Sequence, residues 1–369
     1  MPFADEMIGA WTAESLARAI QAAAPEKTLT RLRQASRQLD GLALRERADL
    51  LRDALLADIG GKYDDVARVV RLARSGSASF RGWMIWPVTS AIATRAVADG
   101  SEAAFDDALQ LMADLTALLT SEFAIRTLLR HNAGRALATI STWSASDDVD
   151  VRRLASEGTR PYLPWSIRVP EIPYGAGATV PILDALYRDP SDYVRRSVAN
   201  HLNDLSRDHA ALVVETAARW LADADENTEW VIRHGLRTLV KRGDVGALSL
   251  LGFSPAEASL EVEGPILDNR VVAAGDAVEI RARIRNTSDE EVRLAVDYVV
   301  HHQKANGKQT PKTFKLTVVT LGPGESASLR RVHSFRPITT RRYYPGAHAI
   351  SLQINGVMSE PSVFELTAD

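Results

Sequence analysis

The spacing of hydrophobic positions changes near residue 252 and divides the chain into two parts. Before that point apolar residues recur at helical intervals, and strict apolar–polar alternation is scarce. The stretch DPSDYVRRSVANHLNDL, residues 189 to 205, predicts an amphipathic helix that Asp189 caps and in which Pro190 takes the first position. Its buried stripe is expected to consist of Val194, Val198, Leu202 and Leu205.

A short helical motif recurs in this first part. VRRLASEG begins at residue 151, VRRSVANH at residue 194 and the similar IRHGLRTL at residue 232, so the offsets are 43 and 38 residues. Periods of this length are typical of HEAT-like repeats, whose paired helices bury their apolar faces against neighbouring pairs. We therefore predict an α-solenoid of HEAT-like repeats over residues 1–252.

Short strands are predicted in the second part, residues 257–369, with the boundary near 253–258. Apolar and polar residues alternate there, and turn signals such as NTSDE, LGPGES and YPGA separate the alternating stretches. About seven strands over this length indicate an all-β immunoglobulin-like sandwich. The clearest strands are VEIRARI (278–284), VRLAVDYVV (292–300), TFKLTVV (313–319) and AISLQI (349–354).

Composition narrows the chemistry. The chain of 369 residues contains no cysteine, which excludes disulfides, thiolate nucleophiles and zinc fingers. The net charge of −3 is atypical of a nucleic-acid-binding protein, but residues 292–345 contain ten Lys or Arg against two acids, a local charge of +8. A basic surface is therefore expected on the second domain.

Targeting and cofactor motifs are not apparent. The sequence has neither an apolar run of about 18 residues nor a basic start followed by an apolar core, so we expect a cytoplasmic protein without a membrane segment. HExxH, phosphate-loop, dinucleotide-binding and GxSxG motifs do not occur, and the eight histidines form no recognisable ligand set. We predict no metal and no cofactor.

Three acids are candidates for catalysis. Glu122 lies in LTSEFAIRTLL, Glu157 ends VRRLASEG, and Asp204 lies in HLNDLSRDH. In a HEAT array the second helix of each pair lines the concave face, so acids from successive units can converge across a groove. The alternative is that each acid is simply solvated, with Asp204 capping the following turn.

The segment after Glu157 cannot continue as a helix. Arg160 and Trp165 follow in RPYLPW, where two prolines stiffen the chain and can present an indole rigidly. These residues alone leave both exposure and burial of Trp165 open, and we expect Arg160 to be available to a phosphate. Trp83 and Trp86, spaced three residues apart in RGWMIWPV, are expected in the core instead.

A basic hairpin is predicted at residues 301–315, HHQKANGKQTPKTFK. An Asn-Gly pair lies between two alternating strands, and Lys304, Lys308, Lys312 and Lys315 surround it. Such a finger can neutralise phosphates. The alternative is a charged edge that prevents aggregation.

Four motifs, in this order, resemble those of the AlkC-type alkylpurine DNA glycosylases, a HEAT-like group related to AlkD. The resemblance spans essentially the whole chain, including an immunoglobulin-like domain that only part of that family carries. The motifs are SEFAIR (121–126), ASEGTRPYLPW (155–165), NDLSRDH (203–209) and DYVVHHQKANGKQTPKTFKL (297–316).

This resemblance implies a monomeric base-excision-repair enzyme. Its partner would be double-stranded DNA containing cationic N3-alkylated bases, notably 3-methyladenine and 3-methylcytosine, excised without flipping the base into a closed pocket. It places Glu122, Glu157 and Asp204 in the lesion cleft as catalytic residues. Phe123, Arg160 and Trp165 would shape the cleft, and His301, His302, Lys304, Lys308 and Lys312 would contact DNA.

The implied chemistry is physically reasonable. Alkylation at N3 makes the base cationic and weakens its bond to the sugar, so departure proceeds through an oxocarbenium-like state. Carboxylates favour that state and can position water, and an aromatic face favours the cationic base. Two alternatives stay open: a non-catalytic HEAT protein that binds bent or damaged DNA, and a protein-binding solenoid with an adhesion module.

Overall fold

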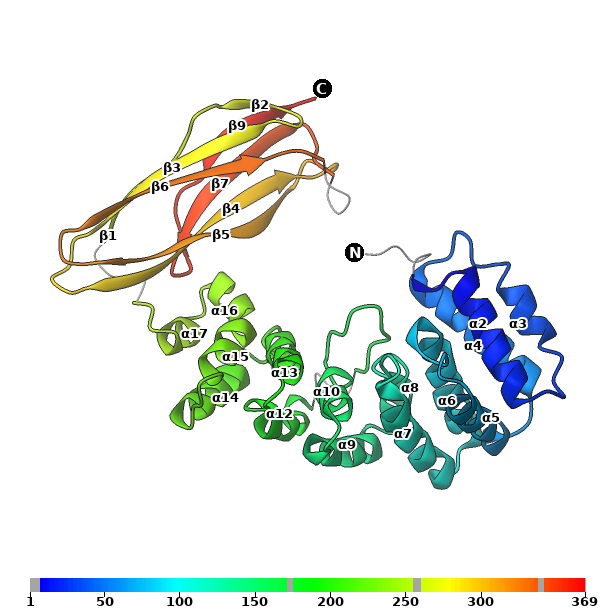
Figure 1. Ribbon diagram of the computed structural model, residues 1–369. Coiled ribbons are helices and arrows are strands. Elements are labelled where there is room, and N and C mark those ends of the chain that lie inside the picture. The colour runs from blue at the N-terminus through cyan, green and yellow to red at the C-terminus, as the bar shows by residue number, and fades with distance from the viewer. Residues whose placement is uncertain (1–6, 171–174, 255–259, 338–341, 369) are drawn as a thin grey trace. The chain divides into compact units, whose positions relative to one another are not determined.

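The computed structural model describes residues 7–170, 175–254, 260–337 and 342–368. These fall into two compact units, Met1–Gly235 and Leu236–Asp369, which are described separately. The first unit is helical, and its helices follow one another in chain order (Figure 1). They are α2 (Ala10–Ala23), α3 (Thr30–Ala35), α4 (Leu44–Ile59), α5 (Tyr63–Gly76), α6 (Ile85–Asp99), α7 (Glu102–Thr116), α8 (Ile125–His131), α9 (Ala133–Thr142), α10 (Val149–Glu157), α12 (Val180–Leu186), α13 (Asp192–Leu205), α14 (Ala210–Ala222) and α15 (Thr228–Gly235).

The three recurring sequence motifs lie on helices that stack on one another. The motifs at 151 and 194 lie on α10 and α13, and the motif at 232 begins in α15 and continues into α16 (Arg237–Arg242); α13 packs against both α10 and α15. The predicted stripe of α13 is buried from Val194 to Leu205. Each helix therefore buries its apolar face against the corresponding helix of the next repeat, as a solenoid requires.

The start of α13 differs from the prediction. The helix begins at Asp192 with Ser191 as its N-cap residue, so Pro190 precedes the helix. The Asp189 carboxylate accepts a hydrogen bond from the Ser191 N–H at 2.9 Å and forms an ion pair with Arg152 at 2.6 Å. Asp189 therefore ties α10 to the loop before α13 instead of capping the helix.

The second unit is a β-sandwich with two short helices before it. α16 (Arg237–Arg242) and α17 (Val245–Leu250) precede β1 (Leu260–Leu267), β2 (Val271–Ala273), β3 (Ala277–Asn286), β4 (Val292–Gln303), β5 (Gln309–Leu321), β6 (Ser326–Ser334), β7 (Gly346–Ile354), β8 (Val357–Met358) and β9 (Ser362–Thr367). One sheet has the order β1-β3-β6 and the other β2-β9-β7-β4-β5, with β8 paired to β7. All four stretches predicted as strands lie within β3, β4, β5 and β7. The predicted fold class, helical repeats followed by an immunoglobulin-like sandwich, is confirmed.

The core of the sandwich lies between its two sheets, and β4 and β7 are buried over most of their length. Buried residues from both sheets, such as Ile280 on β3 and Ile350 on β7, pack around Phe335 and Phe364.

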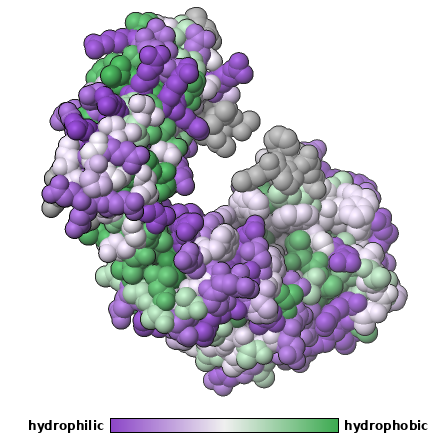
Figure 2. All heavy atoms as spheres, turned by 60° about the vertical axis from the view of Figure 1, so that its left-hand side comes forward, coloured by the Kyte–Doolittle hydropathy of each residue, from purple (hydrophilic) through white to green (hydrophobic). Residues whose placement is uncertain are grey.

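The boundary between the two units lies earlier in the chain than the change in hydrophobic spacing near residue 252. The helices α16 and α17 belong to the second unit. Gln353 donates to the Lys241 carbonyl at 3.0 Å and thereby attaches α16 to the sandwich. Figure 2 shows hydrophilic residues over much of the visible face, with hydrophobic areas between them.

Candidate active site

The three candidate acids meet in the first unit although 82 residues separate the outer two. Glu122 lies in the turn between α7 and α8, Glu157 is the last residue of α10, and Asp204 is the penultimate residue of α13. α10 packs against both α7 and α13, which brings the three segments together. All three side chains are nearly buried, with exposed fractions of 8%, 5% and 1%.

Two arginines link these acids into one alternating network. Arg153 contacts the Glu122 carboxylate and lies 3.5 Å from Glu157 Oε1. Arg160 Nη1 donates to Glu157 Oε1 at 2.5 Å, and its Nε donates to Asp204 Oδ2 at 2.9 Å. Burying charges in this way costs free energy unless each has a partner of opposite sign, which every member of the network has.

The ionisation of the two glutamates differs. Burial raises the pKa of Glu122 above its ordinary value, and the nearby Arg153 only partly offsets that effect. Burial acts in the same direction on Glu157, but Arg153, Arg160 and the Ser197 hydroxyl together hold the pKa of Glu157 below its ordinary value. Of the two glutamates, Glu157 therefore stays ionised more firmly, whereas Glu122 is closer to exchanging a proton.

Neutral polar groups connect Glu157 to α13. The Ser197 hydroxyl donates to Glu157 Oε2 at 2.7 Å and contacts the hydroxyl of Ser156. The His201 ring, fully buried on α13, places Nδ1 2.8 Å from the Ser156 carbonyl. Burial lowers the pKa of His201 to about 4, so this imidazole is neutral and donates its Nδ1–H to that carbonyl.

We expect the stability of the first unit to fall on acidification partly because of His201. Its pKa is lower in the folded protein, so the unfolded chain takes up a proton near pH 6.5 whereas the folded protein does so only near pH 4. The stabilisation is thus present above pH 6.5 and lost as the pH falls to 4, by about 3 kcal/mol. The His201→Asn variant keeps a donor for the carbonyl. Denaturant unfolding at pH 7 and 4.5 measures the change. Between these pH values the free energy of unfolding should fall less in this variant than in the wild type. An equal fall in both proteins would contradict the lowered pKa of His201.

The segment carrying Trp165 is held in place by buried Arg126. From α8, this guanidinium donates to three backbone carbonyls, those of Gly158 (3.2 Å), Arg160 (2.7 Å) and Ile167 (2.6 Å). Both ends of the segment are therefore attached to the same helix. Trp165 lies between them with a φ of +59° and is 48% exposed, so its indole is presented by a segment that is anchored at both ends.

Phe123 and Trp165 line a common small cavity. Phe123 stacks on Trp86 with ring centroids 4.0 Å apart, and Trp86 is buried, as predicted. Both rings line a cavity of about 40 Å³ together with Trp165 and residues of α4. None of the three acids lines this cavity, so the aromatic residues and the acids form adjacent parts of the site and not one enclosed pocket.

Arg160 does not have the environment expected from the sequence. The sequence predicts that it is available to a DNA phosphate, but it is 9% exposed and its guanidinium binds Glu157 and Asp204. The reason is that three acids buried within one network require cations close by. In this structure Arg160 therefore neutralises the two carboxylates.

The basic finger forms the β4–β5 hairpin of the second unit. At its tip the Lys304 N–H donates to the Lys308 carbonyl at 2.9 Å, and Lys304, Lys308 and Lys312 are exposed. His301 is half-buried and hydrogen-bonded to Ser351 at 3.2 Å. His302 is 5% exposed and its ring lies in a cluster of aromatic and histidine rings, although it also lines a concavity beside the hairpin tip. Its contact with DNA stays a prediction.

A basic concavity lies beside the hairpin tip. It has a volume of about 620 Å³, and Lys304, Lys312 and Arg342 line it, with no acid among its described lining residues. The Arg342 guanidinium lies over the ring of Tyr344, 5.4 Å from its centroid. Sequence reasoning missed Arg342 as a site residue, although it falls within the segment of charge +8.

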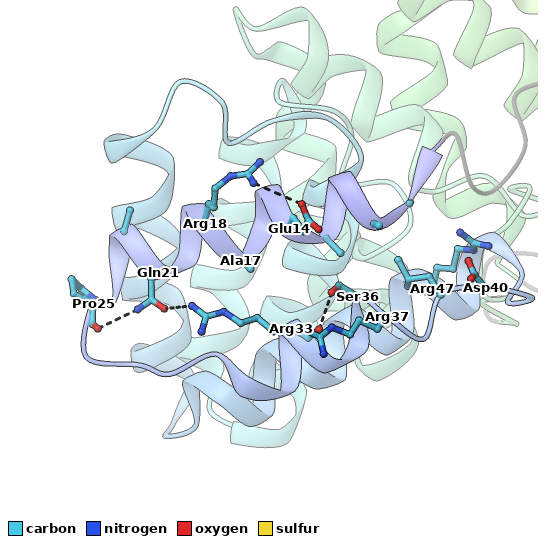
Figure 3. Close-up of a pocket in the computed structure, with 15 residues that line it drawn as sticks. Glu14, Ala17, Arg18, Gln21, Pro25, Arg33, Ser36, Arg37, Asp40 and Arg47 are labelled. Atoms are coloured by element: carbon cyan, nitrogen blue, oxygen red, sulfur yellow. Dashed lines mark hydrogen bonds and ion pairs between the residues drawn. The ribbon is translucent and has the colours of Figure 1, made fainter.

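A larger groove, about 1070 Å³, lies between the first helices of the first unit (Figure 3). Alanines of α2 such as Ala17 form part of its wall, and Arg33 of α3 and Arg37, just after that helix, line the opposite side. Gln21 accepts a hydrogen bond from Arg33 at 3.0 Å. None of the predicted site residues lines this groove. It is therefore separate from the acid network.

Neither metal ligation nor membrane insertion is indicated in the described part of the chain. Within residues 7–170, 175–254, 260–337 and 342–368, no cluster of three or more His, Asp or Glu side chains is arranged to hold a metal ion. Across the same ranges, no helix has the length and apolarity needed to cross a bilayer.

Fold and site together define a helical-repeat protein with a buried acid–arginine network and an immunoglobulin-like domain. Residues 261–368 match the family model described as "Uncharacterised protein YhaZ, C-terminal Ig-like domain". The chain is 35% identical over 262 residues to "Uncharacterized protein YhaZ" of Bacillus subtilis (strain 168), which covers 71% of this chain and 72% of the relative.

A solved structure matches over the full length. It is Pseudomonas fluorescens alkylpurine DNA glycosylase AlkC bound to DNA containing an abasic site analog, with a TM-score of 0.86, 32% identity and 100% of both chains covered. The chain belongs to the protein family that includes YhaZ and AlkC.

Proposed function

We propose that this protein is a monofunctional DNA repair glycosylase. It hydrolyses the N-glycosidic bond of cationic N3-alkylated bases, 3-methyladenine and 3-methylcytosine, in duplex DNA and without flipping the base into a closed pocket. The observation that carries this proposal is the convergence of Glu122, Glu157 and Asp204 in one buried network within a fold that matches AlkC over its full length.

In the proposed reaction the carboxylates act on the sugar. The bond between C1′ and the base breaks, and its electron pair goes to the cationic base, which leaves neutral. The sugar becomes oxocarbenium-like, and the firmly ionised Glu157 stabilises this positive charge. Water then bonds to C1′ and loses a proton to a carboxylate. The product is an abasic site, and no cofactor is consumed.

The aromatic residues contribute to lesion recognition in this proposal. The exposed ring of Trp165 offers its face to a cationic base, an attraction that a neutral base lacks. Phe123 and Trp86 support the cavity beside it. Arg160 acts by holding two of the acids. Discrimination thus follows from charge, and a closed pocket around the base is not required.

The test of this function is base release. Duplex DNA treated with a methylating agent is incubated with the purified protein, and released bases are separated by chromatography. We expect 3-methyladenine and 3-methylcytosine in the supernatant and no strand cleavage. DNA binding without base release would refute the catalytic proposal and favour a non-catalytic protein that binds bent or damaged DNA. Absence of DNA affinity at low salt would favour a protein-binding solenoid.

We expect the basic finger to make salt-dependent contacts with DNA. Replacing Lys304, Lys308 and Lys312 with Gln removes three exposed cations from the hairpin. Each phosphate that the variant no longer neutralises should reduce the slope of log affinity against log salt by about 0.9, so a reduction of about 2 to 3 is expected in fluorescence-anisotropy titrations. Lys241→Gln is the control, because Lys241 is a lysine of the same unit that lies on α16, outside the hairpin. An unchanged slope in the triple variant would remove the finger from the interface.

A glycosylase of this kind acts as a monomer on chromosomal DNA. We accordingly propose that the protein is cytoplasmic and associated with the nucleoid. Sedimentation of the complex with a short duplex tests the stoichiometry, for which one protein per lesion is expected.

A further inference from the structure

Arg153 lies at the centre of the acid network, although its place in the recurring motif VRRLASEG did not mark it as a site residue. It extends from α10 one turn before Glu157. Its Nη1 contacts the Glu122 carboxylate and is 3.2 Å from Thr120 Oγ1, while its Nη2 is 3.5 Å from Glu157 Oε1. A single guanidinium thus spans two carboxylates that come from different elements of the fold.

One face of this guanidinium packs on an aromatic ring. The ring of Tyr193, on α13, lies beneath it with 5.1 Å between the guanidinium carbon and the ring centroid. The Arg153 side chain is only 14% exposed, whereas Tyr193 is 45% exposed. A planar cation that pairs with two acids at its edge and stacks on a ring has one preferred orientation, which a lysine ammonium would lack.

We propose that Arg153 is a positioning residue that fixes Glu122 and Glu157 relative to each other, with Tyr193 as its support. The inference rests on the proposed glycosylase function for its kinetic part. Arg153 touches neither sugar nor base in this scheme and acts only through the two carboxylates.

The electrostatics follow from this geometry. Burial and the neighbouring Glu157 both raise the pKa of Glu122, and Arg153 is the main influence that lowers it. Two carboxylates close together in a buried site cannot both stay ionised without a cation between them. Removing Arg153 should therefore push Glu122 towards its protonated form at neutral pH, in addition to releasing its side chain.

The test compares Arg153→Met with Arg152→Met. The two arginines are neighbours on α10 with similarly buried side chains, 14% and 15% exposed, and each forms ion pairs. Arg152, however, pairs with Asp189 and not with the acid network. Any general effect of losing a partly buried arginine from this helix should be common to both variants.

Two readouts are measured. NMR titration of the glutamate side-chain carboxyl carbons, with the Glu122 signal assigned from Glu122→Gln, should show the pKa of Glu122 raised by about 1 unit or more in Arg153→Met only. The acidic limb of the pH–rate profile for base release should move to higher pH in the same variant. Its plateau rate should fall by about 100-fold through misplacement of the acids, with KM little changed. Arg153→Lys should lie between wild type and Arg153→Met in both readouts.

The outcomes separate this inference from the proposed function. If the wild-type protein releases no base but the Glu122 titration moves as described, the function fails and the positioning role stands. If Arg153→Met titrates as Arg152→Met does and its acidic limb is unmoved, the positioning role is wrong even though the glycosylase activity remains. Should Arg153→Met not fold, Arg153→Lys gives the same comparison, because it retains the charge while losing the bridge.

Discussion

The Glu157→Gln variant is expected to release 3-methyladenine from alkylated duplex DNA about 100- to 1000-fold more slowly than the wild-type protein. The pKa of Glu157 is held below its ordinary value, and both of its carboxylate oxygens are already oriented, one by Arg160 and the other by Ser197. An amide keeps the shape but not the negative charge. The variant should therefore stabilise the transition state less well, because the sugar becomes positively charged there.

Folding and DNA binding should survive this substitution. Arg160 retains Asp204 as a partner, and Arg153 retains Glu122. Single-turnover base release by chromatography measures the rate, and anisotropy with an abasic-analogue duplex measures binding. Glu215→Gln, at an exposed position of α14, is the control and should be unaffected. A Glu157→Gln protein with normal release would mean that the negative charge of Glu157 is not used.

The periodicity of apolar residues was enough to predict the fold, because each repeat must bury its apolar face against its neighbour. The motifs at 151, 194 and 232 recur since the apolar positions of α10, α13 and α15 must each contact a neighbouring helix. Alternation predicted β3 for the same reason, because its buried and exposed residues alternate; it also predicted β4 and β7, although both faces of these two strands are largely buried. The predicted start of α13 failed because Asp189 forms a long-range ion pair that local preferences do not contain.

The site was predictable only in part. Motifs located the acids, but local sequence does not reveal that Arg153 and Arg160 would pair with them from two sides. The equivalent arginines of a repeat can have different partners: Arg153 joins the network, while Arg196, 43 residues later, forms an exposed pair with Asp192. An arginine four residues before Glu157 on the same helix was the one available signal.

The second large effect is expected for stability. Arg160→Met should lower the free energy of unfolding of the first unit by about 3 to 5 kcal/mol, because it leaves buried charges without their partner. Asp204, 1% exposed, loses its only ion pair within the described structure, and Glu157 keeps the longer ion pair with Arg153 and the hydrogen bond from Ser197. Methionine fills much of the arginine volume, so the loss of charge and not a cavity dominates. Urea unfolding followed by helical circular dichroism measures the change.

Arg196→Met provides the comparison, since it removes an arginine from an ion pair whose side chains are 61% and 55% exposed. Such a pair contributes at most about 1 kcal/mol. Lowering the pH protonates buried carboxylates and so removes the charges that Arg160→Met leaves unpaired; the difference from wild type should therefore narrow towards pH 4. A destabilisation no greater than that of Arg196→Met, or one that does not depend on pH, would show that Arg160 does not compensate buried negative charge. The network would then have to be described without it.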